Sequence, residues 1–395
     1  MDDSNLAQKV IPIDGGYCEG GGQLIRNAVA LSAVLSTPIS IRNVRHNRRP
    51  PGLRKQHEAG NCVNLAAEIC YGNTSGVSVG STELEFRPGV VRLPRILTAD
   101  PGTAASTTLL LQVALPCLLF GHDTSSDASS SILTLRGGTN AIQAPQIDYT
   151  VHVFLPFMRK HFGLDLKLII KRRGYFPKGG GSILCTVPPL TGPLPPVVLT
   201  DRGEVQRIFG EARVGGLPYF LANRMKKAAC ARLLAAGFLL EQMQIIAVEE
   251  RPDEVTGSGG GTVLWAETDA GCWIGGSAVS EKGKSPEQVG KEAAEELLRN
   301  LEYGGCVDEY LQDQVIIFLA LAKGRSIIKA GPMTDHTRRA ILLTLVQITF
   351  ENLHRTAIHI AELMTGARFR VDELTRSTMV SCEGIGFVPA VLPSG

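Results

Sequence analysis

The stretch QLIRNAVALSAVLSTPISI, residues 23–41, shows the pattern on which the fold prediction rests. Its first part, up to Leu35, carries apolar side chains at helical spacing, and a short alternating segment typical of a strand follows from Pro38. The same order of helix and then strand recurs at residues 103–135 and 310–329. A unit that recurs in this way predicts an internally repeated α/β architecture, with helices packed on one face of each sheet.

A different pattern interrupts these repeats. Five prolines between Pro188 and Pro196 mark a boundary, and beyond them strand patterns surround a basic helix at residues 218–236. The glycine-rich residues 257–261 are predicted to form a flexible link between two strands. The sequence predicts a large repeated domain, formed by residues 1–200 and 306–395. It also predicts a small inserted α/β domain at residues 201–305.

The composition is that of an ordinary globular chain. Of its 395 residues, 44% are hydrophobic and 20% are charged, and the formal net charge is +2, so a polyanion would have to meet a local patch of cations. The longest apolar run, residues 109–120, is too short to span a bilayer, and we expect no membrane partner. The nine cysteines form no CxxC motif, which favours reduced thiols in a cytosolic or nuclear protein over a zinc site.

Two glycine-rich stretches suggest a protein that handles phosphates. Residues 14–26 and 173–182 each place a cation near a triple glycine, and the first opens a helix whose N-terminal N–H groups favour an anion. Residues 42–55 add six cations around a Pro-Pro-Gly turn, which favours phosphate binding over a merely solvated loop. Glu19 could hold a divalent cation against a phosphate or complement the dipole of the following helix, and both interpretations stay open.

Two further groups of residues have alternative interpretations. Tyr310, Asp313 and Gln314 share one face of a predicted helix, where they would either line a nucleotide pocket or form the solvated end of that helix. His336 lies in a polar turn after a predicted strand. A histidine there can act as a nucleophile or a base, although a lone histidine is more often structural.

Residues 173–181, RGYFPKGGG, are similar to the signature of the RNA 3′-terminal phosphate cyclases, and the chain resembles the animal members of that family. Supporting matches run nearly from end to end, at residues 19–23 with Arg26, 51–57, 102–112, 137–139 and 308–314. The resemblance implies an α/β (α+β) fold of repeated initiation-factor-3-like βαβ-type units, interrupted by a small inserted domain. It also implies a reaction. ATP adenylylates an enzyme histidine, AMP passes to an RNA 3′-phosphate as RNA(3′)pp(5′)A, and the neighbouring 2′-hydroxyl closes a 2′,3′-cyclic phosphate.

The resemblance further implies partners and site residues. ATP and RNA 3′-phosphate ends would be the substrates, and Mg²⁺ or Mn²⁺ would be the metal. The compartment would be the nucleus (nucleoplasm), with the cytoplasm as a second possible location. His336 would be the nucleophile, Glu19 would help to hold the metal, and the triple glycine at residues 179–181 would be a structural turn near the site. Phosphates of ATP or RNA would be bound by Arg26, Arg45, Arg48 and Gln56, and the AMP site would be lined by Gln112, Pro145, Tyr310, Asp313 and Gln314.

The chain departs from the family after the predicted nucleophile. The family pattern GPxTxHTxTAIH is split between residues 331–337 and 356–359 by an extra segment, residues 338–355. This segment would extend the following helix, pack elsewhere or destabilise the protein. It contains His354, a rival nucleophile, but we favour His336 because it keeps the full upstream context.

The alternative function is that of a non-catalytic cyclase-like factor in ribosome assembly and rRNA processing. That branch resembles the enzymes in fold but lacks the nucleophilic histidine, whereas His336, Glu19, Arg26 and Gln112 are all present here. A relative of the enolpyruvyl transferases, which have a similarly repeated architecture, would instead bind a small anionic metabolite.

Overall fold

The computed structural model describes residues 9–17, 21–46, 49, 51–53, 58–123, 129–332 and 350–389. Within these residues the chain forms three similar units and one different unit, each built on its own sheet of at least four strands.

The first unit has the element order β-α-β-α-β-β and a sheet order of β1-β2-β4-β3. The first two strands run parallel on either side of a helix in the chain, and β4 lies antiparallel between β2 and β3. Its elements are β1 Ile11–Asp14, α1 Gly22–Leu35, β2 Ile39–Arg42, α2 Glu58–Cys70, β3 Asn73–Ser75 and β4 Leu84–Arg87.

The second unit repeats this topology. β6 and β8 run parallel, and β10 lies antiparallel between β8 and β9. The short strands β5 Arg92–Leu93 and β7 His122–Asp123 form a separate ribbon. The main elements are β6 Ile96–Ala99, α3 Thr107–Leu119, β8 Ser131–Gly137, α4 Ile147–Tyr149, a π-helical turn at Thr150–Phe154, α5 Leu155–Phe162, β9 Lys167–Gly174 and β10 Gly181–Val187.

The third unit has the same topology but is divided in the sequence. β11 and β17 run parallel, and β19 lies antiparallel between β17 and β18. Its elements are β11 Val198–Leu199, α8 Glu309–Leu321, β17 Lys323–Ala330, α10 Phe350–Thr365, β18 Arg368–Glu373 and β19 Thr378–Ile385. The three units confirm the predicted repeated α/β architecture.

The fourth unit lies in the sequence between the first strand and the first helix of the third. Its sheet order is β13-β12-β15-β16, with β12 and β13 parallel and the other pairs antiparallel. Its elements are β12 Val205–Gly215, α6 Tyr219–Leu234, β13 Met243–Glu249, β15 Gly259–Thr268, β16 Trp273–Val279 and α7 Pro286–Glu302, with short 3-10 turns at Leu240–Gln242 and Pro252–Glu254. We call it the inserted unit; the domain boundaries at residues 201 and 305 stay a prediction.

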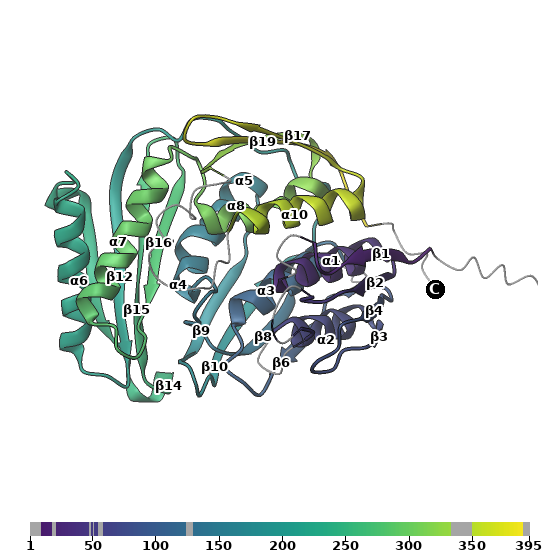
Figure 1. Cartoon of the computed structure of the whole chain (residues 1–395), viewed down its shortest axis with the longest axis horizontal. Coiled ribbons are helices and arrows are strands. Elements are labelled where there is room, and N and C mark those ends of the chain that lie inside the picture. Colours follow the sequence, from purple (N-terminus) through teal and green to yellow (C-terminus); the bar gives the residue numbers. More distant parts are fainter. Residues whose placement is uncertain are drawn as a thin grey trace, which may run out of the picture.

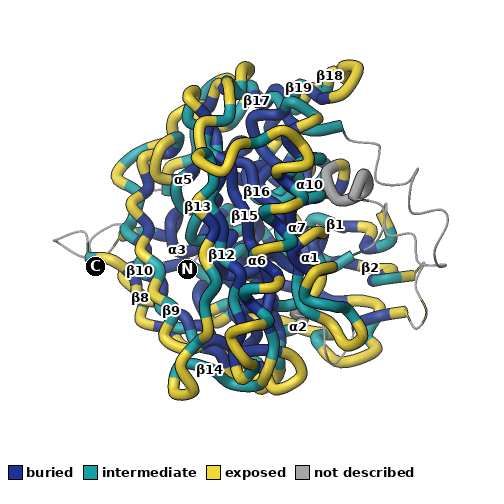
Figure 2. The backbone as a smooth tube through the Cα atoms, turned by 90° about the vertical axis from the view of Figure 1, so that its left-hand side faces the viewer, coloured by how far each residue is buried: buried dark blue, intermediate teal, exposed yellow. Residues whose placement is uncertain are grey.

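Helices of the three repeated units pack against one another, and their sheets lie outside. Figure 1 shows α1, α3, α8 and α10 gathered centrally, with β17 and β19 to one side and β1 and β2 to another. One apolar core joins all three repeated units, whereas α6 and α7 cover a second core on the inserted sheet. Figure 2 shows this buried interior in dark blue, with exposed yellow segments at the outer turns.

The glycine-rich residues 257–261 do not form the predicted flexible link. Gly259 begins β15, which pairs with β12, and β14 (Val255–Thr256) just before it pairs with β9 of the second unit. A Cβ atom on Gly259 would lie 2.5 Å from the Tyr175 ring, so the glycine is needed for a close approach rather than for mobility.

Two further findings concern the cysteines and the helix lengths. Among the described cysteines, all except the half-buried Cys230 are buried. No helix among the described residues is long and apolar enough to cross a bilayer.

Candidate active site

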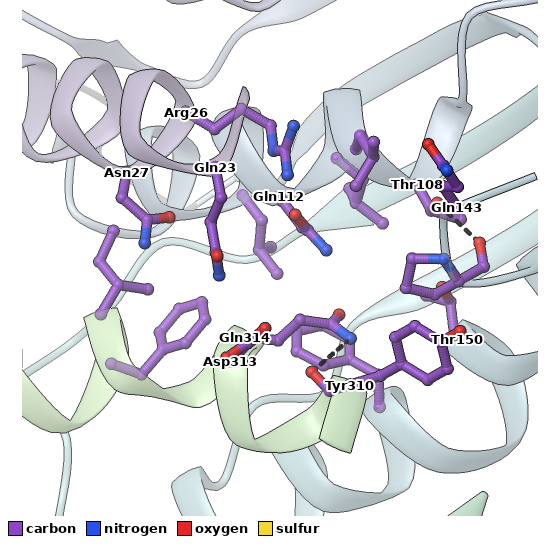
Figure 3. A pocket seen from close by; sticks show the side chains of 17 residues that line it. Gln23, Arg26, Asn27, Thr108, Gln112, Gln143, Thr150, Tyr310, Asp313 and Gln314 are labelled. Carbon is purple, nitrogen blue, oxygen red and sulfur yellow. Dashed lines mark hydrogen bonds between the residues drawn. The ribbon is translucent and has the colours of Figure 1, made fainter. Parts of the chain in front are cut away.

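A cavity lies where helices of all three repeated units meet. It has about 800 Å³ of empty space, which includes its open mouth. Figure 3 shows polar side chains of α1, α3 and α8 directed toward this space. The lining comprises Gln23, Arg26, Asn27, Thr108, Leu109, Leu111, Gln112, Leu115, Gln143, Pro145, Thr150, Phe154, Tyr310, Asp313, Gln314, Ile317 and Phe318.

The α1 wall supplies a cation and a buried amide. α1 begins at Gly22 after a glycine N-cap that gives no side-chain hydrogen bond, and Arg26 lies one turn inside the helix. Gln23 is 8% exposed, and neither its Oε1 nor the Arg26 Nε has a hydrogen-bond partner within the described part of the chain. Buried polar atoms without partners cost free energy, so their position in a cavity wall points to a polar ligand.

The α3 wall is tied to the loop that carries Pro145. Ser106 caps α3 by accepting a hydrogen bond from the Leu109 N–H, and the Thr108 hydroxyl donates to the Pro145 carbonyl at 2.8 Å. Gln112 follows one turn after Thr108 on this helix, so both side chains line the cavity. The hydrogen bond therefore holds the backbone of Pro145 beside the polar face of α3.

The α8 wall confirms the predicted one-sided placement of three side chains. Tyr310, Asp313 and Gln314 all line the cavity, and the Gln314 Nε2 donates to the Tyr310 carbonyl at 3.1 Å. The Tyr310 ring meets the Tyr149 ring edge to face, with centroids 5.5 Å apart. The nearby Glu296 carboxylate and burial raise the pKa of Tyr310 well above its usual value, so its phenol stays neutral.

The structure thus brings six predicted residues together from positions far apart in the chain: Arg26, Gln112, Pro145, Tyr310, Asp313 and Gln314. Arg45 is outside the cavity lining, in the turn that follows β2. This turn packs against the glycine-rich stretch, since a Cβ atom on Gly15 would lie 3.1 Å from the Cα of Val44. Four predicted residues lie outside the described part of the chain: Glu19, Arg48, Gln56 and His336.

Five polar lining residues were not predicted: Gln23, Asn27, Thr108, Gln143 and Thr150. Gln23 and Asn27 are four residues apart and flank Arg26, so helical spacing could have indicated them. Gln143 has a φ of 62°, an unusual conformation for a non-glycine residue that only the fold reveals.

The signature stretch 173–181 is a turn outside the cavity lining. It ends β9 and begins β10, and Gly179 and Gly180 have φ values of 61° and 68°, which favour glycine. The stretch is thus a turn, as predicted, while its place near the site stays a prediction. Arg173 pairs with Asp148 at 2.6 Å and with Glu250 at 2.6 Å, and its side chain is 6% exposed. It thereby joins α4, directly after the cavity loop, to the inserted unit.

The glycine-rich stretch before α1 also contacts α10. The rings of Tyr17 and His359 stack with centroids 4.0 Å apart, which places the second half of the family pattern, residues 356–359, beside the glycine-rich stretch. α10 begins at Phe350, so the last residues of the extra segment 338–355 extend this helix. Residues 333–349 lie outside the described ranges, as does the side chain of His354.

Comparison with known proteins decides the family. The family model described as RNA 3′-terminal phosphate cyclase matches residues 17–352. The chain belongs to the RNA 3′-terminal phosphate cyclase family. It is therefore an enzyme of the ligase class and acts in RNA processing.

Relatives from distant organisms cover almost the whole chain. A Drosophila melanogaster protein named RNA 3′-terminal phosphate cyclase is 35% identical over 97% of this chain and 98% of its own length. One of the same name from Pyrobaculum neutrophilum is 34% identical over 95% of this chain and 99% of its own length. A Dictyostelium discoideum protein, "Probable RNA 3′-terminal phosphate cyclase", is 38% identical over 96% of this chain and 84% of its own length.

Proposed function

We propose that this protein uses ATP to convert an RNA 3′-phosphate end to a 2′,3′-cyclic phosphate. The observation that carries the proposal is the cavity in which Arg26, Gln112, Pro145, Tyr310 and Gln314 meet. The flat Tyr310 ring and the apolar Pro145 ring offer surfaces suited to a purine, and the amides of Gln112 and Gln314 can both donate and accept hydrogen bonds. Arg26 supplies a permanent positive charge for a phosphate.

The first chemical step places AMP on the protein. A neutral ring nitrogen of His336 attacks the α-phosphorus of ATP, a P–N bond forms, and the bond to the β-phosphate oxygen breaks as pyrophosphate leaves. Arg26, together with Arg45, Arg48 and Gln56, would neutralise the charge on the phosphates, because phosphoryl transfer depends more on positioning and electrostatics than on covalent help.

The next steps move AMP to RNA and release it. An oxygen of the RNA 3′-phosphate attacks the same phosphorus, the P–N bond breaks, and RNA(3′)pp(5′)A forms. The 2′-hydroxyl then attacks the RNA phosphorus, loses its proton and displaces AMP, leaving the cyclic phosphate. This last attack is intramolecular, so proximity supplies much of the rate, and it requires the hydroxyl that only RNA carries.

The proposal includes a divalent metal. Glu19 is the residue that would hold Mg²⁺ or Mn²⁺ against the phosphates of ATP, where the ion would offset their negative charge. One carboxylate with phosphate oxygens is an ordinary protein contribution for Mg²⁺. For the cell, we propose the nucleus as the main compartment.

The experiment is an RNA-end assay with a matched substrate. A 5′-labelled oligoribonucleotide with a 3′-phosphate is incubated with the protein, ATP and Mg²⁺. We expect a product that resists phosphatase; the same RNA with a terminal 2′-deoxynucleotide should stop at RNA(3′)pp(5′)A. If neither RNA is changed while the protein binds a ribosome-assembly GTPase without consuming ATP, the cyclase proposal fails and the assembly-factor alternative holds.

A further inference from the structure

Asp308 is a fully buried carboxylate at the start of the helix that forms one cavity wall. Its Oδ1 accepts hydrogen bonds from the backbone N–H groups of Tyr310 and Leu311, at 3.0 Å and 2.9 Å, and so caps α8. The same residue is 0% exposed and is not part of the cavity lining. The first two turns of α8 carry Tyr310, Asp313 and Gln314. Because Asp308 fixes where this helix starts, it also fixes the positions of these three side chains.

Asp308 also contacts two elements outside α8. Its Oδ1 accepts a third hydrogen bond from the Tyr149 hydroxyl at 2.6 Å, and its Oδ2 accepts one from the Gly275 N–H at 2.7 Å. Tyr149 ends α4, directly before the lining residue Thr150, and Gly275 lies in β16 of the inserted unit. One side chain therefore joins three parts of the molecule next to the cavity.

The junction leaves no space for adjustment. A Cβ atom on Gly275 would lie 2.5 Å from the Tyr149 ring and 3.2 Å from the Asp308 Oδ2, so only glycine lets the ring and the carboxylate reach β16. The Gly275 carbonyl, on the other side of the same residue, accepts a hydrogen bond from the Asn300 Nδ2 at 3.0 Å. Asn300 lies in α7, so this second contact stays within the inserted unit.

Neither asparagine nor serine could make all four of these contacts. The four donors around Asp308 need acceptors on both of its oxygens, and an asparagine would turn its NH₂ group toward at least one N–H or O–H donor. A serine would cap α8 but is too short to reach β16 as well. Burying a carboxylate is costly, so its presence at a junction with this many donors indicates a specific positional demand.

We propose that Asp308 is a positioning residue through which the inserted unit holds α8, and with it Tyr310 and Gln314, at the nucleotide cavity. The inference rests on the proposed function, because it takes ATP as the occupant of that cavity. It gives the inserted unit a role in nucleotide affinity that does not require it to touch the nucleotide.

The test compares Asp308→Ser with Asn300→Ala. Each variant removes one hydrogen bond to Gly275, but only Asp308→Ser, which leaves α8 capped, separates that helix from the inserted unit. ATP binding is measured by equilibrium titration, and KM for ATP and kcat are measured on 3′-phosphate RNA. For Asp308→Ser we expect Kd and KM for ATP to rise about tenfold or more, and kcat to change less. For Asn300→Ala we expect each of these constants to change by less than about twofold. Each variant is assayed at a temperature at which thermal unfolding shows it to be folded.

Each outcome assigns the failure to one claim. Equal ATP affinity for Asp308→Ser and the unchanged protein would overturn the positioning role. Equal losses in both variants would overturn it too, because they would reflect general loosening of the inserted unit. If Asp308→Ser does not fold, Asp308→Asn, which keeps the shape of the side chain, carries the comparison with the same expected loss. Failure of the unchanged protein to bind ATP would instead overturn the proposed function.

Discussion

The buried ion network around Arg173 gives a prediction whose magnitude follows from its geometry. Arg173 makes two hydrogen bonds to Asp148, at 2.6 Å and 2.7 Å, and an ion pair with Glu250 at 2.6 Å, all among side chains no more than 10% exposed. Asp148 and Glu250 hold the pKa of Arg173 above its usual value despite burial, which by itself would lower it. In Arg173→Met, two buried carboxylates would lose their main cation.

Removing one partner of a buried ion pair costs about 3–5 kcal/mol of the free energy of unfolding. Arg213 remains 2.9 Å from Glu250 and 3.6 Å from Asp148, so partial compensation places the expected loss near the lower limit, about 3 kcal/mol. Denaturant unfolding at pH 8 measures it. The exposed pair Arg159–Asp165 provides the control, because Arg159→Ala should change the free energy of unfolding by less than about 1 kcal/mol.

A loss below about 1 kcal/mol at pH 8 would refute the reasoning, because the two buried carboxylates would then be about as stable without Arg173 as with it.

Three further predictions concern packing, titration and the cavity. Gly259→Ala would place a methyl group 2.5 Å from the Tyr175 ring, so it should cost about 1–3 kcal/mol in denaturant unfolding, whereas Gly192→Ala, which meets no atom within 4 Å, should cost much less. Burial raises the pKa of Asp308 to about 6, so the folded protein takes up this proton at a higher pH than the unfolded chain does. The free energy of unfolding of the unchanged protein, relative to that of Asp308→Asn, should therefore fall by about 3 kcal/mol as the pH rises from about 4 to above 6. A difference that stays constant with pH would contradict this. Gln112→Ala should weaken ATP binding about tenfold in an equilibrium titration without lowering the melting temperature, and unchanged affinity would place the nucleotide elsewhere.

The repeated fold was predictable because each unit follows one local pattern. The helix at residues 23–35 and the strand after Pro38 appear as α1 and β2, and the two later units follow with shifts of a few residues at their ends. The sequence could not show that the inserted unit divides the third repeat after β11. That strand has only two residues, Val198 and Leu199, and is recognisable only by its pairing with β17.

The site was partly predictable for a different reason. Tyr310, Asp313 and Gln314 follow from helical spacing alone, but their meeting with Arg26 and Gln112 depends on how three units pack. The resemblance supplied those residues; local pattern did not. Gln143 was missed because its role depends on a left-handed backbone, and the glycines at residues 257–261 were misjudged because close packing and flexibility both select glycine.

Whether the extra segment 338–355 permits adenylylation can be tested chemically. It separates His336 from the TAIH sequence at residues 356–359, and its end forms the start of α10. A version of the protein that lacks the segment would restore the family spacing. If it accepts label from ATP while the full chain does not, the segment silences the enzyme.

The most direct test of the account is protein labelling with α-labelled ATP. The chain, His336→Ala and His354→Ala are each incubated with ATP and Mg²⁺ and separated under denaturing conditions. The account predicts an acid-labile label on the unchanged chain and on His354→Ala, and none on His336→Ala, because a phosphoramidate forms at His336. Label that persists in His336→Ala and disappears only in His354→Ala, or no label on the chain with or without its extra segment, would contradict the central claim.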